Sequence, residues 1–319
     1  GNIVITTHHK PDGDAMGSGL GLYNYLRAND ISAKVITPSN YADFLHWLPG
    51  NDEVLIYEGN ETKADALIDK ATLIYCLDYN ALSRSGSMQN SLSDSSATMV
   101  LIDHHQNPEE FDNERFVEIG GSSTCELIYQ YIDEYLEPSS LDKDTATCLF
   151  TGLVTDTGSF RFGSTTSKTL SVAANLMDLG VKPYEIHKQL FDNDRWIRLQ
   201  FLGYYLANKI ELIADGKVAL AHLNTAELEK YDVITGDTEG FVNYGLSIGG
   251  VQLSALIIDR GPLVKMSFRS KDTFKCNEFA AKYFNGGGHI NAAGGASKLS
   301  LEETLEKFKN AINNHLEEL

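Results

Sequence analysis

Histidine and aspartate residues that could bind a metal gather in four short segments of this 319-residue chain. The first segment, His8-x-x-Pro11-Asp12-x-Asp14, places one imidazole and two carboxylates within seven residues. Carboxylate oxygens combined with imidazole suit Mn²⁺ or Mg²⁺ better than the thiolate-rich sites that favour zinc. The other candidates are Asp78, Asp103, His104, His105 and Asp156.

A simpler interpretation is that Asp12 or Asp14 only caps the helix that follows. Capping does not explain why a histidine stands in the same segment, or why further Asp and His residues end other apolar segments. We therefore favour a metal site that combines all four segments.

Apolar segments that alternate with helical patterns would position these residues. This alternation is typical of a parallel sheet with crossover helices. Strands are expected at 3–7, 33–37, 73–77 and 99–102. Three of them run directly into metal-ligand candidates, and sites in open α/β sheets lie outside the carboxyl ends of the strands. The three segments should therefore converge, and a helix at 142–155 would deliver Asp156.

The second half of the chain predicts a smaller α/β domain. The elements expected there are a long helical segment at 183–210, strands at 217–223, 252–258 and 264–268, and an amphipathic helix at 301–316. We expect a first domain at 1–185, a helical connector at 186–210 and a second domain at 211–319.

A glycine run in the second domain is a candidate for binding an anion. Gly286-Gly287-Gly288-His289 would expose consecutive backbone N–H groups and allow a backbone or a phosphate to approach closely. Arg269 on the preceding strand could grip a terminal phosphate through a bidentate contact. A flexible turn is the competing interpretation of the glycines alone.

Composition narrows the class of protein. The net charge of −18 argues against a protein that coats long nucleic acid, but a short anionic substrate is compatible with local positive charge. No apolar stretch approaches the roughly 18 residues that span a bilayer, and the chain opens directly into a strand-like segment. We therefore expect a cytoplasmic protein without membrane contact. The four scattered cysteines are expected to be buried free thiols.

The ordered metal-ligand set resembles that of the DHH phosphoesterase superfamily. The later Gly286 to His289 segment resembles the glycine-rich signature of the DHH-associated C-terminal domain. With Ser267-Phe268-Arg269-Ser270 before it, the chain is most similar to the branch of bifunctional oligoribonucleases (nano-RNases) and pAp phosphatases.

This resemblance implies two Mn²⁺ ions, or Mg²⁺ or another divalent ion in their place. One ion would be held by His8, Asp12 and Asp78, and the other by Asp14, Asp78, His104 and Asp156. A shared Asp78 would keep the two ions about 4 Å apart, where they could activate water against phosphorus. Asp103 would accept a hydrogen bond that fixes an imidazole tautomer.

The remaining site residues would contact substrate. His105 could bind a phosphoryl oxygen or protonate the leaving oxygen. Arg161 could reach the scissile phosphate, and a surface ion pair is the alternative for it. The resemblance implies that the second domain holds the nucleotide through Arg269, Gly287, Gly288 and His289.

The function expected from these residues is hydrolysis of short oligoribonucleotides to mononucleotides and removal of the 3′-phosphate of pAp to give AMP. A phosphodiesterase acting on linear or cyclic dinucleotides would share every residue named. Inorganic pyrophosphatase fits less well, because that chemistry does not need the second-domain nucleotide residues. A non-catalytic nucleotide-sensing protein remains an alternative from another class, and the sequence leaves open whether two copies form a homodimer.

Overall fold

The chain forms two separately packed units, residues 1–193 and residues 194–319. The computed structural model describes residues 2–137, 141–271 and 273–319. Each unit has a six-stranded sheet of its own.

The first unit is built on the parallel sheet that the sequence predicts. Its strand order is β3-β2-β1-β4-β5-β6, and every neighbouring pair is parallel. The strands are β1 (Ile3–Thr6), β2 (Ala33–Thr37), β3 (Leu55–Ile56), β4 (Leu73–Leu77), β5 (Thr98–Asp103) and β6 (Glu114–Val117). The chain passes outward from β1 to β3 and then returns to the other side of β1 as β4. This reversal between β1 and β4 is where open α/β sheets place their sites.

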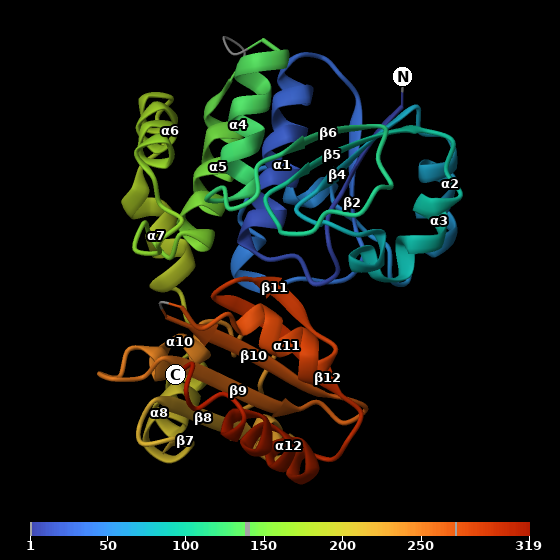
Figure 1. Ribbon diagram of the computed structural model, residues 1–319. Coiled ribbons are helices and arrows are strands. Elements are labelled where there is room, and N and C mark those ends of the chain that lie inside the picture. The colour runs from blue at the N-terminus through green and yellow to red at the C-terminus, as the bar shows by residue number, and fades with distance from the viewer. Residues whose placement is uncertain (1, 138–140, 272) are drawn as a thin grey trace. The chain divides into compact units, whose positions relative to one another are not determined.

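Helices cover both faces of this sheet (Figure 1). One face packs against α1 (Gly13–Ala28), α4 (Thr124–Tyr135) and α5 (Lys143–Asp156), and the opposite face packs against α2 (Glu61–Asp69) and α3 (Gln89–Ser93). Side chains alternate between the two faces. Ile5 therefore packs against the α1, α4 and α5 side of the sheet, and Val4 against the α2 and α3 side. Helices α6 (Ser167–Asp178) and α7 (Pro183–Phe191) follow α5.

Small residues let α1, α4 and α5 approach closely. A Cβ atom added at Gly17 on α1 would lie 2.7 Å from the carbonyl oxygen of Cys148 on α5. One added at Gly152 would lie 2.2 Å from Cys125 Sγ and 2.9 Å from Asp14 Oδ1. The same glycines that bring the helices together therefore also bring α5 against the Asp14 carboxylate.

The second unit is the smaller α/β domain expected from the sequence. Its sheet has the order β11-β12-β10-β9-β8-β7, with β8 and β9 parallel and the other pairs antiparallel. The strands are β7 (Ile210–Ile213), β8 (Val218–Leu223), β9 (Leu253–Asp259), β10 (Val264–Ser270), β11 (Gly287–His289) and β12 (Ala292–Ser297). The helices are α8 (Trp196–Asn208), α9 (Thr225–Lys230), α10 (Phe241–Leu246), α11 (Cys276–Phe284) and α12 (Leu301–Asn313). Helices α8 and α10 pack on one face, and α11 and α12 on the other.

The helical segment expected at 183–210 is divided between the two units. Helix α7 ends at Phe191 and buries Ile186 in the first unit, whereas α8 begins at Trp196 and buries Phe201 and Tyr205 in the second. Polar residues between the two helices interrupt the apolar pattern.

The described helices include none that is both long and apolar enough to span a bilayer. All four cysteines are buried free thiols, as expected.

The packing of α5 yields a stability prediction. Gly152→Ala should lower the free energy of unfolding of the first unit by about 2 kcal/mol or more, because overpacking a tight core forces backbone shifts. Gly163→Ala, where an added Cβ atom meets nothing within 4 Å, is the matched control and should change little. Urea unfolding followed by Trp47 fluorescence in a Trp196→Phe background measures the first unit. Equal stability of the two glycine variants would contradict this account of the packing.

Candidate metal centre

The predicted metal ligands meet at the carboxyl edge of the first sheet. His8 follows β1, Asp78 follows β4, and His104 follows β5. Asp14 lies in the first turn of α1, and Asp156 is the last residue of α5. Five separate elements thus bring their polar residues to the point where the strand order reverses.

His8 lies against two carboxylates. Its Nε2 atom is 3.8 Å from Asp12 Oδ2 and 3.5 Å from Asp78 Oδ2. Its Nδ1 atom lies 3.0 Å from the carbonyl oxygen of His9. A hydrogen bond there would fix the ring with Nε2 toward the carboxylates. Ligating histidines are usually oriented in this way, by a hydrogen bond from the ring nitrogen that does not bind the metal.

His104 lies against three carboxylates. Its Nε2 atom is 3.6 Å from Asp14 Oδ2, from Asp78 Oδ1 and from Asp156 Oδ2. Its Nδ1 atom lies 2.8 Å from the carbonyl oxygen of Gly121, which orients this ring in the same way. Asp78 therefore presents Oδ2 to His8 and Oδ1 to His104. One carboxylate faces both groups, as expected of a bridging ligand.

Each of the two groups has its ligand atoms close enough to hold an ion. The atoms of His8, Asp12 and Asp78 lie within 4.8 Å of one another, and so do those of Asp14, His104 and Asp156. The donor atoms are carboxylate oxygens and imidazole nitrogens, which fit Mn²⁺ or Mg²⁺. The assignment of individual ligands remains a prediction.

The electrostatics of the cluster favour a bound cation. Burial, followed by the negative charges of Asp78 and Asp156, raises the pKa of Asp14 well above its usual value. Burial alone would lower the pKa of His8, but its hydrogen bonds to Asp12 and Asp78 outweigh burial and raise that pKa to about 10. His8 thus retains its proton at neutral pH, and a bound cation would supply the positive charge that favours ionisation of Asp14.

The start of α4 holds two of the carboxylates in place. The backbone N–H groups of Thr124 and Cys125 donate to Asp14 Oδ2 and Oδ1, at 2.6 and 2.9 Å. The Thr124 hydroxyl donates to Asp78 Oδ1 at 2.9 Å. A helix N-terminus stabilises a carboxylate through its unpaired N–H groups and its dipole. Thr124 was not predicted, and its only sequence signal is the capping Ser123 before it.

Two of the aspartates also have a backbone role. Asp12 is the N-cap of α1 and accepts from the backbone N–H groups of Asp14 and Ala15 at 3.0 and 3.1 Å. The capping alternative is thus correct for Asp12, but the same side chain also faces His8. Asp78 adopts a left-handed backbone conformation with φ of 64°, which few non-glycine residues adopt. Such strain is typical of functional positions.

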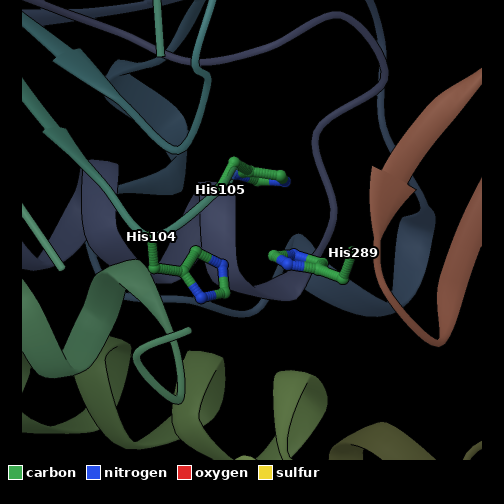
Figure 2. Close-up of side chains that lie close together, drawn as sticks. All are labelled: His104, His105 and His289. Carbon is green, nitrogen blue, oxygen red and sulfur yellow. The ribbon is translucent and has the colours of Figure 1, made fainter. Parts of the chain in front are cut away.

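Asp103 and His105 form a hydrogen-bonded pair beside the metal ligands. His105 Nδ1 lies 2.7 Å from Asp103 Oδ1, and both side chains are buried. Figure 2 shows the neighbouring side chains of His104 and His105. Their ring centroids lie 5.0 Å apart, with the rings at 70° to each other. Asp103 is positioned to fix the tautomer of His105. The catalytic role of His105 remains a prediction.

Arg161 is engaged with its own turn. Its Nε atom donates to the carbonyl oxygen of Gly158 at 2.7 Å, and its guanidinium lies 5.9 Å from the centre of the Phe162 ring. The turn itself is unusual, because Gly158, Ser159 and Phe160 all have positive φ. The hydrogen bond uses only Nε, and whether Arg161 contacts a phosphate remains a prediction.

The nucleotide-binding candidates of the second unit lie in one row of its sheet. Arg269 on β10 and His289 on β11 both pair with Ala292, on the strand between them. Residues paired in this way across antiparallel strands point to the same face. The glycine run is needed for close approach of backbone, because a Cβ atom at Gly288 would lie 2.4 Å from the carbonyl oxygen of Ala292. Gly287 also pairs within this hairpin, and whether these residues bind substrate remains a prediction.

Comparison with known proteins places both units in one family. The DHH family N-terminal domain matches residues 2–153, and the DHHA1 domain matches residues 215–318. The bifunctional oligoribonuclease and PAP phosphatase of Thermus thermophilus is 32% identical over 99% of this chain and 90% of its own length. The cyclic-di-AMP phosphodiesterase of Bacillus subtilis is 27% identical over 99% of this chain but only 48% of its own length.

A solved structure agrees with this comparison. The crystal structure of an exopolyphosphatase-related protein from Bacteroides fragilis superposes with a TM-score of 0.93 and 38% identity, covering 99% of this chain and 92% of that one. The resemblance inferred from the sequence motifs is confirmed, and the chain belongs to the DHH family of phosphoesterases, with a DHHA1 domain in its second unit.

Proposed function

We propose that this protein is a manganese-dependent phosphoesterase that removes the 3′-phosphate of pAp and hydrolyses short oligoribonucleotides to mononucleotides. The observation that carries the proposal is the pair of His and Asp groups that share Asp78. Near full-length similarity to a bifunctional oligoribonuclease and PAP phosphatase supports the choice of substrates.

The side chains have separate tasks in this proposal. His8, Asp12 and Asp78 would hold one cation, and Asp14, Asp78, His104 and Asp156 the other. Bound divalent cations would supply a water of lowered pKa and would neutralise charge on the phosphoryl group. The remaining steps fall to residues that do not bind metal.

His105 is the candidate for moving a proton to the leaving oxygen. Its Nδ1 lies against Asp103, so the proton that leaves would come from Nε2. The paired carboxylate stabilises the imidazolium before transfer and keeps the ring from rotating.

The second unit would recognise the nucleotide. Arg269 and His289, on one face of the sheet, would bind a terminal phosphate through charge-assisted hydrogen bonds. Gly287 and Gly288 would allow close approach of the substrate along the β11 edge strand.

A dinucleotide phosphodiesterase is the second candidate, because a cyclic-di-AMP phosphodiesterase is similar to this chain over both domains. Chromatography of the products from pAp, a linear dinucleotide and a five-residue RNA distinguishes the two. We expect AMP and phosphate from pAp and mononucleotides from the RNA. Turnover of the dinucleotide alone would favour the second candidate, and binding of pAp without any product would indicate a sensing protein.

The first prediction from this proposal concerns Asp78. Asp78→Ala should abolish phosphate release from pAp, because the change removes the carboxylate that faces both histidines. The Glu185→Ala variant removes an exposed carboxylate on α7 of the same unit and should retain turnover. Phosphate release by Asp78→Ala at the wild-type rate, or by wild-type protein in a chelator, would contradict the two-metal mechanism.

The second prediction separates the adjacent histidines. His104→Ala should lower the metal content, because it deletes one ligand. His105→Ala should keep its metal but lower turnover roughly 10²-fold or more, the usual scale for a lost general acid. Elemental analysis of both variants, with rates on pAp and on a nitrophenyl phosphate ester, measures this. The His105 loss should be smaller on the nitrophenyl ester, whose leaving group needs no proton, and metal loss in the His105 variant would reverse the assignment.

The third prediction concerns pH. Because hydrogen bonds to Asp12 and Asp78 outweigh burial and raise the pKa of His8 to about 10, this imidazole is protonated at pH 7 and must lose its proton to bind a metal. Mn²⁺ affinity should therefore rise from pH 6 to pH 8.5, and binding should release protons. Calorimetry in two buffers of different ionisation enthalpy counts the protons released. An observed enthalpy that is the same in both buffers at pH 7 would be inconsistent with this ligand.

A further inference from the structure

A polar cavity of about 370 Å³ opens in the first unit. It is lined by His9, Glu58, Ser83, Arg84, Gly86 and Ser87. These residues come from the segments that follow β1, β3 and β4, so the cavity belongs to the same carboxyl edge of the sheet as the metal ligands.

The cavity is joined directly to the metal cluster through the His8-His9 segment. The backbone N–H of His9 donates to the carbonyl oxygen of Arg84 at 2.7 Å. A Cβ atom added at Gly86 would lie 3.2 Å from the His9 side chain, so the loop after β4 packs tightly here. Gly86 also has φ of 59° and ψ of −127°, which a residue with a side chain would rarely adopt. The loop that lines the cavity is thus held in place by close packing and by a hydrogen bond.

Arg84 is the cationic group of the cavity. Its backbone carbonyl accepts from the N–H of His9, so Arg84 lies next to the segment that carries the metal-ligand candidate His8. Among the described residues, 2–137, 141–271 and 273–319, the structure gives Arg84 no ion pair with a carboxylate. Of the other arginines in the described part of the chain, Arg27, Arg115, Arg195 and Arg198 do have one, whereas Arg161 and Arg260 bond to a carbonyl or a hydroxyl oxygen instead.

This contrast is informative because acidic side chains outnumber basic ones by 44 to 26. A half-buried arginine in so acidic a chain would be expected to pair with a carboxylate. Arg84 instead faces a cavity, where its charge is available to an anion from outside the chain.

The other lining groups suit a phosphate. Ser83 and Ser87 add hydroxyl donors on the same loop as Arg84. Glu58 is the one acidic residue there, but it lies 3.5 Å from His9 Nε2 and its side chain is 53% exposed, so its charge is screened. A guanidinium with neighbouring hydroxyl groups is the combination that recognises phosphate oxygens.

We propose that this cavity is a phosphate subsite of the first unit, in which Arg84 binds the non-bridging oxygens of a substrate phosphate group beside the His8 ligand. The inference rests on the proposed phosphoesterase function and names a residue that neither the sequence motifs nor the metal cluster identified. It also supplies the local positive charge that a chain of net charge −18 needs in order to attract an anionic substrate.

Two binding measurements test the subsite. Calorimetry with inorganic phosphate on Mn²⁺-loaded protein should give at least a tenfold weaker affinity for Arg84→Gln and an intermediate loss for Arg84→Lys, which keeps the charge but not the planar fork. Mn²⁺ affinity of the same variants should stay equal or increase, because Arg84→Gln removes a cation from beside the metal ligands. Arg27→Gln, which breaks a surface ion pair with Asp144, is the matched control and should match wild type in both.

The outcomes separate this inference from the proposed function. Unchanged phosphate affinity in Arg84→Gln, or no phosphate binding by the wild type, overturns the subsite. Parallel losses of phosphate and Mn²⁺ affinity also overturn it, because they would make Arg84 a structural residue of the loop. If wild-type protein fails to hydrolyse pAp while Arg84→Gln still loses phosphate affinity, the proposed function fails and the anion subsite stands.

Discussion

Mutual repulsion between buried carboxylates is the constraint on which the first unit depends. Asp14 and Asp78 are almost fully buried. Asp12 lies 3.8 Å from His8, and Asp156 lies 3.6 Å from His104. Carboxylates so close together in a poorly solvated site cannot all be ionised without compensating positive charge. Burial first, and then the negative charges of Asp78 and Asp156, raise the pKa of Asp14, as expected of such a site.

Several parts of the fold offset this repulsion. The start of α4 directs two backbone N–H groups at Asp14, and Thr124 adds a hydroxyl donor to Asp78. Two divalent cations would complete the compensation and displace the protons that the cluster otherwise retains. The tight glycine packing of α5 matters here because it brings that helix, and Asp156 at its end, to the cluster.

Sequence reasoning worked best where a strong apolar pattern ended in polar residues. The buried strands β1, β4 and β5 are nearly continuous in apolar residues, so both their positions and the convergence of His8, Asp78 and His104 could be predicted. The short edge strands β3 and β6 were missed because so few residues carry no clear periodicity. The connector at 186–210 had a helical pattern throughout, but only packing shows that α7 and α8 enter different cores.

Contacts made by backbone atoms or by residues far apart in sequence could not be predicted. Thr124 contributes partly through its N–H group, which every residue but proline possesses, and it lies 46 positions from Asp78. The hydrogen bond from Arg161 to the Gly158 carbonyl likewise had no signal in the sequence. The glycine run resembled a turn or an anion nest, and the structure shows a strand whose glycines allow close backbone pairing.

The central claim is that one carboxylate, Asp78, joins two adjacent cation sites. Electron paramagnetic resonance during titration of metal-stripped protein with Mn²⁺ tests it most directly, because the spectrum reports both the number of ions bound and their proximity. The account predicts two ions per chain, with the six-line signal of the first ion broadening through spin coupling as the second binds. A single ion at saturation, or two ions whose spectra remain those of isolated Mn²⁺, would contradict it.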